Sequence, residues 1–515
     1  MFLFFTAVLW AAAAIYTQGY LAQDERRKRF DVFLLFTMCG NFGLLMVQDV
    51  PGFYTFFALM TFSAFGLVIH TGTKEARRAA RIYLITAIFG EALLLGAIFL
   101  AVAEAESTLL ADLAPAVAAA ESRNLIMALA FFGFGVKAGA LPVHLWLPLA
   151  HPVGPAPASA VLSGAMIKAG LLGWMWFLPL GHGSFPGWSA FLIAMGLVAA
   201  FYAVLVGYTQ DDPKTTLAYS SISQMGVMTV ALGIGLSEPE AWRAALPVLL
   251  LYALNHGLAK GALFFGTGVA LATGRARHGR WLVIGGLALP ALAIAGAPWT
   301  GGGMAKYALK DAAALVPEQM APWLDWLLPV SAVGTSLLLG RFLWLVWWSM
   351  EEKPAATPHL AMTIPWVLLL GAVAATVVFV VRFFALEIAT SPASSMTIWN
   401  GMWPILLGLA LMLAAARLLG GKPNRFTVPA GDIVVWCEAA ARRLQASWRA
   451  LPEIGSGRSV LNFVEPLERL AASERRHDFA NRMEDSLRNR DLPGLLFIVL
   501  ALAVVALLFF GDPVR

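Results

Sequence analysis

Six titratable side chains interrupt long apolar segments of this sequence, and their types are those that bind and release protons. They are Glu91, Lys137, Lys168, His256, Lys260 and Lys306. A charged side chain at the centre of a bilayer costs about 2.5 to 3.5 kcal/mol on insertion scales, so such groups usually face a hydrated interior. His256 and Lys260 are four residues apart and share a helix face, so a proton could pass between them directly or through water. The pattern predicts a hydrated line of charges through a membrane.

Two of the lysines lie in segments where a helix should break. FFGFGVKAGALPVHLWLPLAHP, residues 131–152, carries Lys137 and then Pro142, and a later segment has Pro298 and three glycines just before Lys306. Proline removes a backbone donor and clashes with the preceding turn. Broken helices at membrane depth are tolerated where the freed backbone groups face protein or water, as in ion pathways. Two such helices, each with a lysine, predict two structural repeats.

Each of these groups also has a plainer interpretation. Lysines near the ends of membrane spans usually extend to the headgroups, which would apply to Lys168 and Lys260. Glu91 could be only the structural partner of a neighbouring cation. His144 and His151 flank prolines, so a capping or loop role is as reasonable for them as proton transfer.

The composition is that of a polytopic membrane protein. Of 515 residues, 59% are hydrophobic and 13% are charged, and the mean hydropathy is +0.73. A span needs roughly 20 apolar residues. About fourteen such segments are present: 2–20, 30–48, 52–70, 82–103, 124–148, 157–181, 187–209, 216–236, 243–271, 281–313, 323–348, 361–385, 398–418 and 492–511. The predicted fold class is all-α.

Loop charges predict the orientation. The basic clusters DERRKR, TKEARRAAR and GRARHGR follow the first, third and ninth spans, and the loops after even-numbered spans are neutral or acidic. Lys and Arg accumulate on the cytoplasmic side. We therefore expect the N-terminus outside and the basic loops inside a bacterial cytoplasmic membrane. The first segment lacks a basic n-region, so we do not expect a cleavable signal.

The sequence carries no signature of a metal, cofactor or nucleotide site. Cys39 and Cys437 are without CxxC or CxxxH spacing. Neither GxGxxG after a strand nor GxxxxGK[ST] occurs. The net charge of +5 follows from the basic loops and calls for no nucleic acid. We expect no cofactor and no metal, and any electron chemistry would belong to partner subunits.

Four motifs together resemble one family: the antiporter-like proton-translocating subunits shared by respiratory complex I, Mrp sodium/proton antiporters and membrane-bound hydrogenases. They are GVKAGALPVHLWLPLAHP, DDPKTTLAYSSISQMGVM, NHGLAKGALFF and TGGGMAK, within a match from about residue 30 to 350. LPLAHP followed by SAVLSGAMIKAG is most similar to the large antiporter-like subunit of formate hydrogenlyase and hydrogenase-4 complexes.

The resemblance implies a role for each buried charge. Lys137 would be the central lysine of a first half-channel, Lys168 with the His256/Lys260 pair the connecting axis, and Lys306 the terminal residue. It implies two inverted five-helix repeats, in residues 30–185 and 186–350. Accessory roles are expected for His144, His151, Asp212, Lys214 and Ser223.

Two departures from the family pattern stand out. The family carries a glutamate in the helix matching 52–70 that pairs with the central lysine, and this chain has Ala58 there. We expect Glu91, one span later, to replace it as counter-ion of Lys137. Relatives usually have two more helices before the span that matches 2–20, so the resemblance leads us to expect an N-terminally shortened chain, with a separate small subunit filling the gap.

Outside the two repeats, the sequence divides into an N-terminal helix and basic loop (1–29), further spans (351–424), an arm (425–490) and a terminal anchor (491–515). Val434, Ala439 and Trp448 give the otherwise basic arm an apolar face, as in helices that lie on a membrane or on neighbouring subunits. The family's largest subunits carry a lateral helix before a last span, which this arm resembles. Contact with lipid alone is the alternative, and the arm is expected on the cytoplasmic side.

The leading functional prediction is a proton-translocating, or less favoured sodium-translocating, subunit of a multi-subunit respiratory or hydrogenase-like complex. A second is a proton path that energises solute uptake, for instance of inorganic carbon, by a soluble zinc-containing partner. A third is a transport-inactive membrane anchor, because the family glutamate is absent at Ala58.

Overall fold

The computed structural model describes residues 1–383, 395–418 and 428–435, with Glu438, Ala440 and Arg443. The chain divides into two units, residues 1–432 and 433–515, and the account below concerns the first. The predicted arm (425–490) therefore lies almost wholly, and the predicted span 492–511 entirely, outside the described residues. Within them the architecture is helical, and the only extended pairing is an isolated bridge between Asp49 and Leu109.

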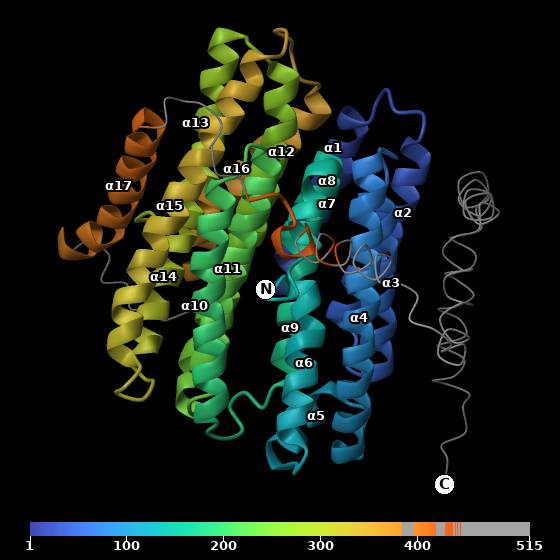
Figure 1. The fold of residues 1–515 in the computed structure, drawn as a ribbon, viewed down its shortest axis with the longest axis vertical. Helices are drawn as coiled ribbons and strands as arrows, with labels where there is room; N and C mark the ends of the chain where they lie inside the picture. The colour runs from blue at the N-terminus through green and yellow to red at the C-terminus, as the bar shows by residue number, and fades with distance from the viewer. Residues whose placement is uncertain (384–394, 419–427, 436–437, 439, 441–442, 444–515) are drawn as a thin grey trace, which may run out of the picture. The chain divides into compact units, whose positions relative to one another are not determined.

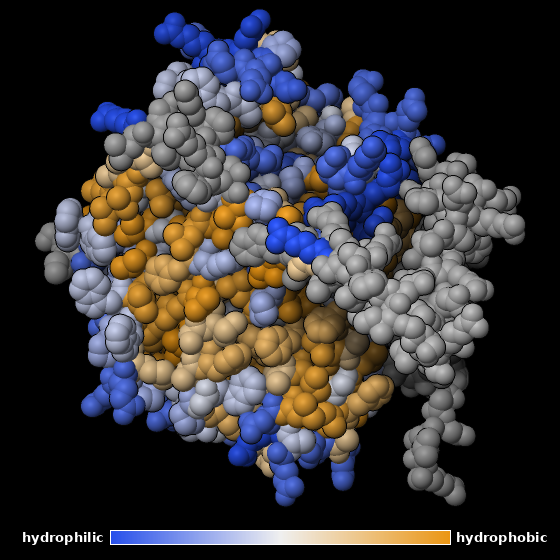
Figure 2. All heavy atoms as spheres, in the orientation of Figure 1, coloured by the Kyte–Doolittle hydropathy of each residue, from blue (hydrophilic) through white to orange (hydrophobic). Residues whose placement is uncertain are grey.

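Twelve described helices are long and apolar enough to cross a membrane. They are α1 (Phe2–Tyr20), α2 (Arg27–Met46), α3 (Val50–Val68), α4 (Lys74–Ala105), the continuous α8 to α9 (Ala156–Phe177), α10 (Pro186–Tyr208), α11 (Pro213–Gly235), α12 (Pro239–Thr273), α13 (Arg277–Ala295), α15 (Ala321–Glu351), α16 (Leu360–Phe383) and α17 (Ser395–Leu418). On the face seen in Figure 2, hydrophobic residues cover the middle of the bundle and hydrophilic residues gather at both ends. The chain is a multi-span membrane protein.

Two helices form the centre of the bundle. All of the apolar window of α11 and 94% of that of α12 are buried, and both lie between other helices in Figure 1. Helix α10 packs closely on α11 because small residues face each other: a Cβ on Gly226 would lie 2.5 Å from the carbonyl oxygen of Gly196. Close approach at small residues is how helices associate where the hydrophobic effect cannot drive them together.

The first break separates α6 (Arg123–Ala138) from the short α7 (Leu147–Val153). Gly139 ends α6 with φ 74°, a left-handed conformation that glycine adopts without strain. Helix α6 has only 16 residues, so the span predicted at 124–148 is not one continuous helix. Trp146 fixes the far side of the break by donating from Nε1 to the carbonyl oxygen of Val136 at 2.6 Å.

The second break divides the span predicted at 281–313. Helix α13 ends at Ala295, Gly296 has φ 93°, and α14 (Gly301–Ala313) begins after Thr300, whose hydroxyl accepts from the Gly303 N–H. A third irregularity was not predicted: a π-helical turn, η1 (Leu162–Met166), joins α8 (Ala156–Val161) to α9 (Ile167–Phe177). Such turns leave backbone carbonyls misaligned and are frequent at functional sites.

Two of the basic loops lie together at one end of the bundle. His70, after α3, contacts Asp24, after α1, at 3.0 Å between Nε2 and Oδ2. Arg26 also donates to the carbonyl oxygen of Thr71. Both loops are therefore on the same side, as the charge pattern requires; which side faces the cytoplasm stays a prediction.

Candidate functional site: buried charges along the broken helices

Lys137 is enclosed by aromatic rings near the end of α6. Its ammonium is buried and lies 5.4 to 5.9 Å from the ring centroids of Phe57, Tyr83 and Trp146. It also donates to the Tyr83 hydroxyl at 3.1 Å, and that hydroxyl donates to the carbonyl oxygen of Thr61 at 2.6 Å. Ring faces attract cations within about 6 Å, so α3, α4 and the break supply partial compensation for this charge.

Glu91 faces the same small cavity from α4. The cavity has an empty volume of about 250 Å³ and is lined by Glu91, Lys137, Phe57 and Thr61 among others. Glu91 is 6% exposed, and neither carboxylate oxygen has a hydrogen-bond partner among the described residues. Ala58 is not among the residues that line the cavity, so α3 presents Phe57 and Thr61 to the lysine where the family glutamate was expected.

Lys168 and His256 form the most direct contact of the site. The Lys168 ammonium lies 2.5 Å from Nδ1 of His256 and donates to the carbonyl oxygen of Ser163 at 2.7 Å. Ser163 belongs to the π-helical turn, so the irregular backbone of η1 supplies an acceptor to the lysine that follows it. Lys168 is 1% exposed; it does not extend to the headgroups.

Lys260 is also fully buried, but its partners lie on α11. It donates to the carbonyl oxygen of Leu217 at 2.8 Å and to the hydroxyl of Ser220. No direct hydrogen bond joins it to His256, whose Nε2 has no partner among the described residues. His256 and Lys260, although four residues apart on α12, therefore contact different helices: His256 contacts Lys168 of α9, and Lys260 contacts α11.

Lys306 lies at the second break. It is half-buried and donates to the carbonyl oxygen of Ala295, the last residue of α13, at 2.7 Å. Its side chain packs against Gly296, where a Cβ would lie 2.6 Å from the lysine Cδ. Gly302 is required nearby, since a Cβ there would overlap the carbonyl oxygen of Ala293. The predicted glycine-rich interruption therefore lets α14 approach the carbonyl end of α13.

The expected accessory residues divide into two groups. His151 is buried, stacks on Phe264 at 4.7 Å between ring centroids, and has no partner for either ring nitrogen among the described residues. Lys214 donates to the carbonyl oxygen of Gly154 at 2.5 Å. Both can hold a proton beside α7.

Asp212 and Ser223 have local roles instead. Asp212 caps α11 by accepting from the Thr215 N–H at 2.7 Å. Ser223 donates to the carbonyl oxygen of Ala200 and so ties α11 to α10. Neither contacts one of the six buried charges predicted above by a hydrogen bond that the structure records.

One buried acid was missed. Asp432 is fully buried, and its Oδ2 lies 3.3 Å from Nε2 of His144 and 2.8 Å from the Tyr219 hydroxyl. The sequence places Asp432 in the polar stretch taken as the start of the arm, and only a single acid beside the apolar run IVVW marked it. His144 is fully buried as well and lies in the non-helical break between α6 and α7.

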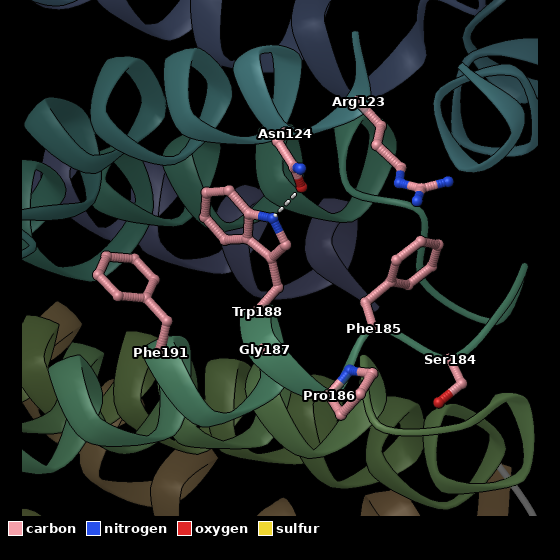
Figure 3. A pocket seen from close by; sticks show the side chains of 8 residues that line it. All are labelled: Arg123, Asn124, Ser184, Phe185, Pro186, Gly187, Trp188 and Phe191. Atoms are coloured by element: carbon pink, nitrogen blue, oxygen red, sulfur yellow. Dashed lines mark hydrogen bonds between the residues drawn. The ribbon is translucent and has the colours of Figure 1, made fainter. Parts of the chain in front are cut away.

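A cleft lies away from these charges. It has a volume of about 490 Å³ and opens between the start of α6 and the start of α10. Figure 3 shows Trp188 and Asn124 facing each other across it, and Trp188 donates to the Asn124 amide oxygen at 2.9 Å. Arg123 is its only titratable lining residue. Among the residues that the structure describes, no cluster of three or more His, Cys, Asp or Glu could hold a metal.

The fold and these sites define a class: a polytopic membrane protein with interrupted helices and a buried line of titratable groups. Residues 47–309, just over half of the chain, match the family model described as NADH:quinone oxidoreductase/Mrp antiporter, TM. The chain belongs to this family.

Relatives and solved structures agree with that assignment. Hydrogenase-4 component B of Escherichia coli (strain K12) is 32% identical over 52% of this chain and 41% of its own length. Na(+)/H(+) antiporter subunit A1 of Staphylococcus haemolyticus is 28% identical over 80% of this chain and 58% of its own length. The chain thus spans about half the length of these relatives.

Two solved complexes share the fold. The Mrp complex from Dietzia sp. DQ12-45-1b contains a chain that aligns with a TM-score of 0.68 at 22% identity, over 99% of this chain and 55% of that one. The membrane-bound sulfane sulfur reductase, an archaeal respiratory complex, aligns with a TM-score of 0.62 at 21% identity, over 80% and 82%. Both structural neighbours are multi-subunit membrane complexes.

Proposed function

We propose that this chain is a proton-translocating subunit of a multi-subunit membrane complex, of the respiratory or hydrogenase-like kind. One observation carries the proposal: the 2.5 Å contact between Lys168 and His256. It joins a side chain of the first predicted repeat to one of the second, inside helices that are almost fully buried. A buried path between the two halves needs such a link.

The chemistry of that link favours transfer over storage. Two cationic groups at hydrogen-bond distance cannot both be charged in a low dielectric, and no carboxylate of the described residues bonds to either of them. One proton therefore serves both nitrogens, the lysine donating while charged and the imidazole Nδ1 accepting. Lys260, tied to α11, and Lys306, at the second break, would continue the path through water. No group of three or more His, Cys, Asp or Glu that could hold a metal ion occurs among the described residues, and we therefore propose protons rather than sodium.

The first half-channel is proposed to use Glu91 in place of the absent glutamate. Glu91 and Lys137 face one cavity without touching, so a water molecule could relay a proton between them. The aromatic enclosure would keep Lys137 in place when the carboxylate is neutral.

The remaining features of the proposal follow the loop charges and the relatives. We propose an outward N-terminus, inward basic loops, two inverted repeats in residues 30–185 and 186–350, and a cytoplasmic lateral arm. Membrane subunits, and soluble redox or zinc-containing proteins, are the proposed partners.

The test replaces Lys168 by Gln in the assembly that co-purifies with the chain. After reconstitution into liposomes, an imposed potassium-diffusion potential drives protons, and a pH-sensitive dye reports the flux. Lys310→Gln is the matched control, because Lys310 is an exposed lysine on α14. We expect a loss on the order of 100-fold for Lys168→Gln, as for loss of an acid–base group, and no loss for the control. Unchanged flux in Lys168→Gln would support the transport-inactive anchor instead.

A further inference from the structure

A second buried acid–base site lies at the break between α6 and α7, and it involves none of the six residues of the proposed path. We propose that His144 and Asp432 form a carboxylate–imidazole dyad that binds and releases a proton there. The inference rests on the proposed function of proton translocation and adds a further proton-binding site to it. The dyad is assembled from the break itself and from residues 428–432, which follow α17 in the chain.

Residues 428–432 pack against the helices of the first unit, to which they belong. Gln210, after α10, donates to the carbonyl oxygen of Val428 at 2.8 Å, and the Val428 N–H donates to the hydroxyl of Thr209 at 3.3 Å. On the other side, Gly431 has φ 83°, and a Cβ there would lie within 2.9 Å of the Leu149 side chain of α7. These contacts place Asp432 over the break with no exposed surface.

A fully buried carboxylate needs compensation, and this one receives it from two donors on one oxygen. His144 Nε2 and the Tyr219 hydroxyl both reach Oδ2, at 3.3 and 2.8 Å. Because Nε2 donates to the carboxylate, the neutral ring presents its lone pair at Nδ1, and Nδ1 has no partner among the described residues. A carboxylate behind an imidazole fixes its tautomer and its orientation.

The proton balance is simple. A proton taken up at Nδ1 gives an imidazolium that is paired with Asp432, and its release from Nδ1 restores the neutral ring with hydrogen on Nε2. Each element packed around the dyad contributes a group: the Tyr202 ring of α10 lies edge-on to His144 at 5.8 Å, and Tyr219 comes from α11. Next to Gln210 in the chain, Asp211 pairs with Arg341 of α15 at 2.9 Å.

Asp432 could instead serve only to hold residues 428–432 in place. A double-mutant cycle distinguishes this structural role from a role in proton transfer. Asp432→Asn keeps the shape of the side chain and removes its charge, His144→Gln removes the titratable ring, and Tyr219→Phe removes only the second hydrogen bond to the same oxygen. In the reconstituted assembly we expect Asp432→Asn and His144→Gln each to lower proton flux on the order of 100-fold. The double variant should be no worse than either single variant, and Tyr219→Phe should retain most of the flux.

Additive losses, or a loss in Tyr219→Phe as large as that in Asp432→Asn, would show a docking role and overturn the proposal. Unchanged flux in Asp432→Asn, in a preparation where Lys168→Gln is inactive, would overturn the dyad and leave the proposed path standing.

Infrared difference spectra recorded after a pH step report histidine protonation directly and do not depend on transport. They therefore test the dyad even if the wild-type assembly conducts no protons. A histidine protonation signal that is lost in His144→Gln and displaced in Asp432→Asn supports the dyad. Spectra identical to wild type in both variants overturn it.

Discussion

Replacing Glu91 by Gln tests whether the first half-channel works without the family glutamate. The substitution preserves the size of the side chain inside the cavity that it shares with Lys137 and removes only the charge. If Glu91 is the counter-ion of Lys137, the ammonium then loses its only buried acid neighbour and keeps the Tyr83 hydroxyl and the three rings.

The size of the effect follows from the separation of the two groups. They form no ion pair within 4 Å among the described residues, so at an effective dielectric constant of about 20 their attraction is below about 4 kcal/mol. Loss of half of that, about 2 kcal/mol, lowers the charged population of Lys137 about 30-fold. We therefore expect proton flux to fall by a factor between about 10 and 100.

The assay is dye-monitored flux in liposomes, with Glu104→Gln as the matched control. Glu104 lies on the same helix, α4, and is exposed, so it changes the net charge equally without touching the cavity. Tyr83→Phe, which removes the hydroxyl and keeps the ring, should cost less than Glu91→Gln. Flux equal to wild type in Glu91→Gln would refute the counter-ion argument and leave the aromatic rings and the Tyr83 hydroxyl as the groups that stabilise Lys137.

Two further predictions concern stability, measured as thermal unfolding of the detergent-solubilised chain. Gly226→Ala should lower the free energy of unfolding by about 1 to 3 kcal/mol, because the new methyl forces α11 away from Gly196. Gly285→Ala is the control and should be near neutral, because no atom lies within 4 Å of its new methyl. Equal losses in the two variants would contradict the packing argument. Burial lowers the pKa of His70 despite its bond to Asp24, so the folded state binds fewer protons than the unfolded state, whose histidine pKa is about 6.5. The free energy of unfolding should therefore be highest above about pH 6.5 and should decline as the pH falls through that value. His70→Gln should make this decline shallower. An unchanged slope in His70→Gln would contradict the role of His70.

The sequence predicts the membrane class and the breaks because both depend on local chemistry. Apolar length predicts the spans, and Gly139, Gly296 and the flanking prolines mark where α6 and α13 end. The six buried charges are visible for the same reason: a lysine or glutamate inside an apolar run is costly unless the fold accommodates it.

Partners across the bundle could not be predicted in this way. Helical spacing places His256 and Lys260 on one face, yet packing directs them to Lys168 and to α11. The π-helical turn before Lys168 has no local signature in LSGAM. Asp432 was missed because its partner His144 is 288 residues away, and long-range pairing of that kind is set by tertiary packing alone.

Among the side chains that the structure describes, Glu91 and Asp432 are the only buried carboxylates. Each accompanies a basic group of the first broken helix: Glu91 shares a cavity with Lys137, and Asp432 bonds to His144 in the break. Among the described residues, Lys168 and His256 instead bond to each other, and Lys168 also bonds to the neutral carbonyl oxygen of Ser163. A proton can therefore be held as part of a neutral pair beside the first break, but at the link between the two halves it adds a net charge. In the proposed path, that difference in free energy would make the contact between Lys168 and His256 the barrier and the first break the reservoir. Variants at Lys168 should then change the rate of translocation, and variants at Glu91 or Asp432 should change the proton occupancy that precedes it.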